Sequence, residues 1–118
     1  MVKCKEGKIA IDGRCKEVTN ITISARRWFD KINGNTYHSV DVFVNGKHVG
    51  NKPFEYGYDE MYLQTAHKIL QDAGVFKKTD KRLQSGMDKD YYDFMMDMRE
   101  HRDKYVKVVS DVARKKDL

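Results

Sequence analysis

Hydrophobic and polar residues alternate with a period of two between residues 21 and 53, which is the pattern of half-buried β-strands. Asn45-Gly46 lies between two of the alternating segments, and this dipeptide is a strong signal for a two-residue hairpin turn. A polar stretch near residues 30–35 marks a second turn. The pattern therefore predicts three antiparallel strands, over residues 21–29, 37–44 and 47–53.

The same alternation assigns the side chains of these strands to two faces, because successive side chains on a strand point to opposite sides. One face is apolar and is the expected core: Ile21, Ile23, Ala25, Phe29, Val40, Val42, Val44 and Val49. The other face mixes aromatic with polar and basic side chains: Arg26, Trp28, Tyr37, Ser39, Asp41, Phe43 and His48. This second face is either a binding surface or a further core layer covered by another element.

Apolar residues at three- and four-residue spacing predict a helix over residues 59–73. Asp59 and Glu60 suit its N-terminus, where the helix dipole favours negative charge, and Gly74 suits the position just after its C-terminus. This helix is expected to cover the apolar face of the sheet.

A second helix is predicted over residues 88–115, because apolar residues recur there every seven positions, at Tyr91, Met98, Tyr105 and Val112. A helix of ~25 residues is longer than the small sheet. It is therefore expected either to fold over the domain and cover the second sheet face, or to form a homodimer by packing on a second copy of itself.

Together these elements predict an α+β fold with a small antiparallel sheet of three to five strands, one helix packed on it, and a long C-terminal helix. A chain of 118 residues has the length of one domain. Asp12-Gly13 predicts one more hairpin near the N-terminus. The expected organisation is an N-terminal hairpin in 1–18, a sheet and helix core in 19–76, a basic connector in 77–87 and a helix in 88–115.

Composition and charge narrow the class of protein. No segment approaches the ~18 consecutive apolar residues of a membrane-spanning helix, so no membrane partner is expected. The first residues lack the apolar stretch of a signal peptide, which predicts an intracellular protein with Cys4 and Cys15 as reduced thiols. A disulfide or a metal site that includes these cysteines is the alternative.

The net charge of +5 either attracts a polyanion or belongs to a solvated surface.

Motifs for catalysis, phosphate binding and metal binding are absent from the sequence. It contains no Gly-x-Ser-x-Gly elbow, no Gly-rich phosphate loop, and no Cys-x2-Cys or His-x3-His pair. The aspartates between residues 88 and 97 are expected to form a solvated helix face. We therefore expect a protein that is not an enzyme and that uses no cofactor and no metal.

The candidate binding residues are aromatic, histidine and basic residues of the strands, the strand ends and the connector. Aromatic rings can stack on nucleobases while basic side chains neutralise phosphate. The candidates are Arg26, Arg27, Trp28, Tyr37, His38, Phe43, His48, Tyr56, Tyr58, Lys77, Lys78, Lys81 and Arg82.

Four segments between residues 20 and 76 resemble a family of short uncharacterised proteins encoded in tailed-phage genomes. They are ARRWFDK (25–31), GNTYHSV (34–40), PFEYGY (53–58) and YLQTA (62–66). The resemblance implies a phage setting, and hence the cytoplasm of an infected bacterial host, but supplies no activity. Short phage proteins of this size frequently act as stoichiometric inhibitors of host or defence proteins.

A weaker resemblance links the order of three strands and a helix to the later part of a double-stranded-RNA-binding domain. In that family a basic helix start grips phosphate, whereas the corresponding residues 58–62 here are acidic and aromatic. No RNA-binding role is carried over from this family.

Two functions follow from these patterns. The favoured one is a non-catalytic inhibitor of a host or defence protein, of anti-defence or host-takeover type, which uses the C-terminal helix. The alternative is a nucleic-acid-binding module that uses the aromatic and basic sheet face, and this alternative requires that face to be open.

Overall fold

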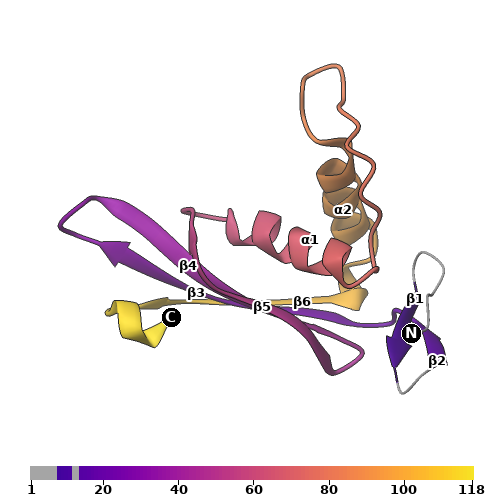
Figure 1. Cartoon of the computed structure of the whole chain (residues 1–118), viewed down its shortest axis with the longest axis horizontal. Coiled ribbons are helices and arrows are strands. Elements are labelled where there is room, and N and C mark those ends of the chain that lie inside the picture. Colours follow the sequence, from indigo (N-terminus) through magenta and orange to yellow (C-terminus); the bar gives the residue numbers. More distant parts are fainter. Residues whose placement is uncertain (1–7, 12–13) are drawn as a thin grey trace.

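The fold is built on one four-stranded sheet, seen nearly edge-on in the computed structural model, which describes residues 8–11 and 14–118 (Figure 1). Its strands are β3 (Ile21–Asp30), β4 (Asn35–Val44), β5 (Lys47–Tyr56) and β6 (Tyr105–Val112). Their order is β5-β4-β3-β6, with β3, β4 and β5 antiparallel and β6 parallel to β3. The α+β class is therefore confirmed, with a mixed sheet in place of the antiparallel one that was predicted.

The three strands predicted between residues 21 and 53 are present, and each is ten residues long. At the β4–β5 turn, Asn45 and Gly46 both have positive φ, as a primed hairpin turn requires. The Asn45 side chain also binds the segment before β3, because its Oδ1 accepts from the amide of Thr19 at 2.8 Å and its Nδ2 donates to the carbonyl of Glu17 at 2.7 Å. The turn thus helps to position the start of the sheet.

Helix α1 (Tyr62–Asp72) lies on the apolar face of the sheet, as predicted (Figure 1). It approaches β5 closely at Gly50, where a Cβ atom would overlap the Cγ2 of Ile69. The core between helix and sheet is made of apolar side chains from both: Ile21, Ile23, Ala25, Val40, Val42, Val44, Leu63, Ala66, Ile69 and Leu70.

The prediction of a long C-terminal helix over residues 88–115 is wrong. Helix α2 (Lys89–Glu100) ends halfway along that range and is followed by the 3-10 turn η1 (Arg102–Lys104), strand β6 and the 3-10 turn η2 (Lys115–Asp117). The stretch VKVVSDV (106–112) is rich in β-branched residues, which pack well on a pleated sheet, and β3 supplies its hydrogen-bond partners. The predicted homodimer seam along this helix is therefore wrong as well.

The turn between α2 and β6 is fixed by the carboxylate of Asp97. This carboxylate accepts a hydrogen bond from the Tyr105 hydroxyl. It also forms an ion pair with Lys104, whose Nζ lies 2.7 Å away. Burial of the ring, together with the hydrogen bond to Asp97, raises the pKa of Tyr105 above its ordinary value. Tyr105 therefore stays a hydrogen-bond donor and begins β6 directly after the turn.

The N-terminal hairpin is present in β1 (Lys8–Ile11) and β2 (Arg14–Glu17), which form a separate two-stranded sheet. The predicted turn at residues 12–13 and Cys4 lie outside the described residues. Cys15 is disulfide-bonded, so the expectation of a reduced thiol is wrong for this residue. None of the described helices is long and apolar enough to cross a membrane.

Candidate binding surface

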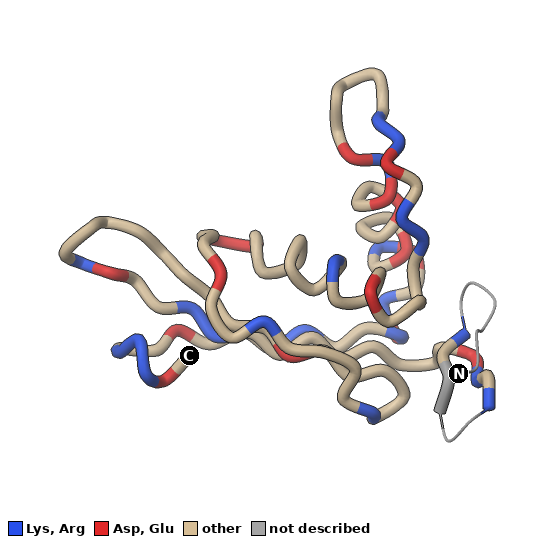
Figure 2. The backbone as a smooth tube through the Cα atoms, in the orientation of Figure 1, with Lys and Arg blue, Asp and Glu red and all other residues tan. Residues whose placement is uncertain are grey.

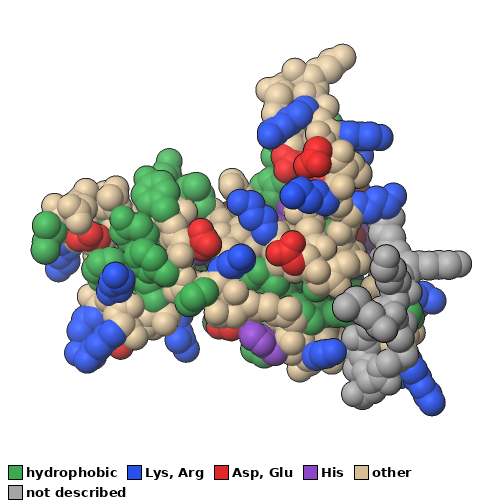
Figure 3. Space-filling view, viewed as in Figure 1, with side chains coloured by type: hydrophobic (Ala, Val, Ile, Leu, Met, Phe, Trp, Pro, Cys, Tyr) green, Lys and Arg blue, Asp and Glu red, His purple; other side chains and the backbone are tan. Residues whose placement is uncertain are grey.

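Helix α1 covers only part of the sheet, and the end that carries the β3–β4 turn projects beyond it (Figure 1). Large apolar side chains at this end are exposed, from 43% for Phe54 to 94% for Ile32. In the space-filling view, hydrophobic side chains gather over the same end of the molecule (Figure 3). We call this region the aromatic end and define it by Trp28, Phe29, Ile32, Tyr37, Phe54, Tyr56 and Tyr58.

Three rings of the aromatic end stack across neighbouring strands on the sheet face opposite α1. The Tyr37 ring lies between those of Trp28 and Phe54, with centroid distances of 5.9 and 4.6 Å and interplanar angles of 25° and 18°. Tyr56 meets Tyr37 edge-on at 5.8 Å, and Lys115 Nζ lies 4.9 Å from the centroid of the Phe54 ring. Such stacking fixes the rings relative to one another and makes a rigid surface.

The helix-side face of the aromatic end is shaped by Arg27. Its guanidinium donates to the Asp111 carboxylate of β6 at 2.8 Å and to the Asp59 carbonyl at 3.0 Å. These bonds tie β3 to β6 and to the segment before α1. A shallow hollow of about 400 Å³ beside them is lined partly by Phe29 and Tyr58. Arg27 is thus occupied by internal contacts, while the two aromatic side chains next to it are exposed.

His38 is buried and does not belong to the surface. It lies under α1, with Nδ1 3.1 Å from the Gly57 carbonyl and Nε2 2.7 Å from the Thr65 hydroxyl. Its position follows from strand parity, because residue 38 points to the same side as Val40 and Val42. His38 is therefore part of the core that joins β4 to α1.

Phe43 and His48 share the sheet face opposite α1 but lie at its other end. Their ring centroids are 5.0 Å apart, and His48 Nε2 lies 2.9 Å from the Asp41 carboxylate. Arg26 lies between this pair and the aromatic end, is exposed, and forms no ion pair with any described residue. The face predicted from alternation is thus observed, and neither helix packs on it (Figure 1).

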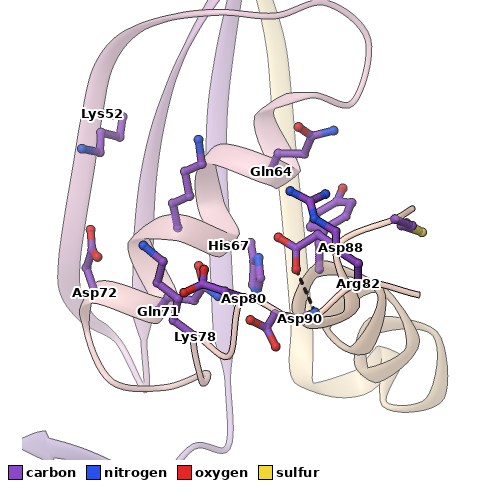
Figure 4. A pocket seen from close by; sticks show the side chains of 13 residues that line it. Lys52, Gln64, His67, Gln71, Asp72, Lys78, Asp80, Arg82, Asp88 and Asp90 are labelled. Atoms are coloured by element: carbon purple, nitrogen blue, oxygen red, sulfur yellow. Dashed lines mark hydrogen bonds between the residues drawn. The ribbon is translucent and has the colours of Figure 1, made fainter. Parts of the chain in front are cut away.

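The basic candidates of the connector lie far from this face, on the side of the helices. Lys78 and Arg82 line a pocket of about 540 Å³ between α1, the connector and the start of α2 (Figure 4). Acidic and basic residues are interspersed along this part of the chain (Figure 2). Lys77 and Lys81 line a smaller hollow nearby. The predicted candidates therefore do not form a single site.

His67 is the residue of this pocket that the sequence analysis missed. It is 3% exposed, stacks on Phe94 at 5.0 Å, and its Nε2 has no hydrogen-bond partner among the described residues. Burial lowers the pKa of His67 below its ordinary value, although the nearby carboxylates of Asp88 and Asp90 act in the opposite direction. The native protein therefore holds this imidazole neutral.

Replacing His67 by phenylalanine is expected to flatten the decline of stability on mild acidification. Below the ordinary histidine pKa of ~6.5, the unfolded chain binds a proton at this imidazole, whereas the native protein, with its lowered pKa, does not. The free energy of unfolding of the wild type therefore decreases as the pH is lowered. Phenylalanine keeps the stacking on Phe94 and removes both the titration and the unpaired nitrogen. Urea unfolding from about pH 7 to pH 5 measures the difference, and parallel pH profiles of the two proteins would contradict it.

The aromatic end carries no net charge. Its residues lie in segments 26–39 and 54–60, and segment 111–118 adjoins them; the three segments together contain six basic and six acidic residues. The net charge of +5 of the whole chain therefore resides elsewhere. A polyanion gains little from a neutral surface, because its affinity comes mainly from cations that neutralise phosphate.

Sequence reasoning missed several residues of this surface. The third strand was expected to stop at residue 53, whereas β5 continues to Tyr56, so that Phe54, which was not a candidate, joins the candidate Tyr56 on the face of Tyr37. Continued alternation in PFEY (53–56) was a signal for this extension. The exposure of Phe29 had no local signal, because it depends on where α1 begins.

Comparison with known proteins finds no matching family model, no matching curated protein and no matching solved structure.

Proposed function

We propose that this chain is a non-catalytic binding protein that docks on a folded protein partner through its aromatic end. We further propose that it acts as a stoichiometric inhibitor of a host or defence protein in the cytoplasm of an infected bacterium. The inhibitory role rests on the resemblance of residues 20–76 to short tailed-phage proteins. The docking surface rests on one observation, the clustering of exposed aromatic side chains at one end of the sheet.

Exposed aromatic side chains on a rigid frame are typical of protein interfaces. Trp, Tyr and Arg are enriched among the residues whose truncation costs most binding energy, and monomeric proteins rarely expose large contiguous apolar patches. Here the rings are held by cross-strand stacking, so little side-chain entropy is lost on binding. Arg26 at the border of the patch supplies an unpaired cation for a partner carboxylate.

Nucleic acid is the alternative partner. Binding of nucleic acid requires an aromatic sheet face that no helix covers, and neither α1 nor α2 covers this face (Figure 1). Two observations favour a protein instead. The Tyr37 ring is sandwiched between those of Trp28 and Phe54, which leaves neither of its faces to a base, and the surrounding segments are electrically neutral. Protein–DNA interfaces are in contrast strongly positive, and base stacking requires a free ring face.

The proposal predicts that Tyr56→Ala removes capture of a single protein partner from a lysate of infected host cells. Tyr56 is exposed at the end of β5, so the variant is expected to fold, whereas truncation of an anchor residue costs at least ~2 kcal/mol, or roughly 30-fold in affinity. Tyr92→Ala, on the exposed side of α2, is the matched control and should capture the partner like the wild type.

Trp28 emission tests the alternative, because this is the only tryptophan of the chain and lies within the aromatic end. Titration with short single-stranded DNA, single-stranded RNA and duplexes at physiological salt is expected to leave the emission unchanged. A saturating change that persists at this salt concentration would place bases on the sheet and contradict the protein-binding proposal.

A further inference from the structure

The two edges of the four-stranded sheet differ in how well they are protected from pairing with another strand. The outer strand β5 contains Pro53 and pairs with β4 through two register irregularities. Proline and bulges are features by which proteins prevent edge-to-edge association. The opposite outer strand, β6, contains neither proline nor glycine, and its register with β3 is continuous over eight residue pairs.

The outer edge of β6 is uncovered in the part of the chain that the structure describes. β6 is the last strand in the sheet order, and the chain after it turns across the sheet toward β5, where Lys115 Nζ lies over the Phe54 ring. Val106, Val108 and Val109 are exposed, with Val108 at 52%. A straight apolar strand with unpaired backbone groups is a template for another strand.

We propose that β6 pairs antiparallel with β6 of a second copy of this chain, so that two four-stranded sheets join into one. A two-fold axis perpendicular to the sheet relates antiparallel copies of the same strand and keeps both sheets facing the same way. Residues that lie directly opposite each other on paired strands point to the same face of the sheet. Under this symmetry, an even-numbered residue can therefore lie opposite only another even-numbered residue, and an odd-numbered residue opposite only an odd-numbered one.

Charge selects one of these registers. When Val109 lies opposite Val109 of the second copy, Lys107 of each copy lies opposite Asp111 of the other, and Val106 lies opposite Val112. The register centred one step earlier, on Val108, places Lys107 opposite Val109, and the one centred on Lys107 places two lysines together. Lys107 forms no ion pair with a described residue. The Asp111 carboxylate is already paired with Arg27, but its side chain is 73% exposed, so its oxygens can accept a further hydrogen bond from Lys107 of the second copy.

The same charges explain why a second copy is favoured over an unrelated strand. A lysine in the middle of an edge strand opposes pairing with most sequences, since the strand opposite it must supply an acidic residue at the matching position. A second copy of β6 supplies this acidic residue as Asp111, and the two-fold symmetry gives two such Lys107–Asp111 pairs per interface. In the joined sheet, α1 and α2 of both copies lie on one face, and each copy keeps its own aromatic end.

Charge reversal tests this pairing and its register. Lys107→Asp places two acidic residues opposite each other at both ends of the interface, and Asp111→Lys places two lysines there. Each variant alone is expected to raise the dimer dissociation constant roughly tenfold or more, since like charges directly opposite on paired strands are unfavourable. An equimolar mixture of the two variants is expected to recover dimers, because every pair is then of opposite charge.

Sedimentation equilibrium over a range of concentrations measures these constants, and Lys31→Asp in the exposed β3–β4 turn is the matched charge control, which should dimerise like the wild type. Circular dichroism and urea unfolding check that each variant is folded. A wild type that stays monomeric at all concentrations, or a mixture that does not recover dimers, would overturn the proposal. Loss of dimers in Tyr56→Ala would instead assign the aromatic end to self-association and overturn it as well.

Discussion

Replacing Phe94 by alanine is expected to lower the free energy of unfolding by about 3–5 kcal/mol, the usual cost of removing a fully buried aromatic ring. Phe94 is 0% exposed and lies at the centre of an aromatic cluster. Its ring stacks on His67 of α1 at 5.0 Å, meets Phe76 edge-on at 5.3 Å, and lies 6.0 Å from Tyr105 at the start of β6. One side chain of α2 thus holds α2 against both α1 and the sheet.

Urea unfolding followed by circular dichroism measures this loss, together with the slope of the free energy against denaturant concentration. Tyr92→Ala removes a ring from the exposed side of the same helix and is expected to change stability by no more than about 0.5 kcal/mol. A loss below about 1 kcal/mol for Phe94→Ala would mean that α2 does not depend on this cluster for its position.

Replacing His38 by alanine is expected to cost about 2–4 kcal/mol, because it opens a cavity and leaves buried polar groups without partners. The imidazole is 1% exposed and bridges the carbonyl of Gly57, at the end of β5, to the hydroxyl of Thr65 in α1. Gly57 packs so closely against His38 that a Cβ atom there would lie 2.9 Å from the ring. His38 therefore holds the strand-to-helix connection in place.

His48→Ala is the matched control for His38→Ala, since it removes an imidazole from the exposed side of the neighbouring strand, where its pair with Asp41 is solvent-accessible. Exposed ion pairs contribute ~0–1 kcal/mol, so the control should unfold close to the wild type. Equal losses in the two variants would contradict the structural role given to His38. Urea unfolding at one pH measures both variants.

The three strands between residues 21 and 56 were largely predictable because their signals are local. Alternation marks which side chains share a face, and Asn45-Gly46 supplies the backbone conformation that the β4–β5 turn requires. Strand β6 was not predictable in this way. It pairs with β3 at sequence separations such as the 84 residues between Arg27 and Asp111, and a seven-residue apolar spacing there matched a helix equally well.

The candidate binding residues likewise divide into those that local patterns placed correctly and those whose position depends on the whole fold. Trp28, Tyr37, Phe43 and His48 were correctly assigned to one face by parity. Parity also contained the signal that His38 points into the core, because it shares a side with Val40, although its residue type suggested a surface role. The basic residues of the connector were grouped with this face on charge alone, and the fold separates them from it.

The sequence by itself determined the strand faces, the apolar core under α1 and the absence of a motif for catalysis, because each depends on residue spacing along a few neighbouring positions. Only the tertiary structure decided which surfaces stay exposed. α1 begins at Tyr62 and does not cover the end of the sheet that carries the β3–β4 turn, so Phe29 is 53% exposed although it has the parity of a core residue. Likewise, residues 105–112 form a strand because β3 offers them an unpaired edge, and hydrogen bonding to a distant strand is a property of the folded chain.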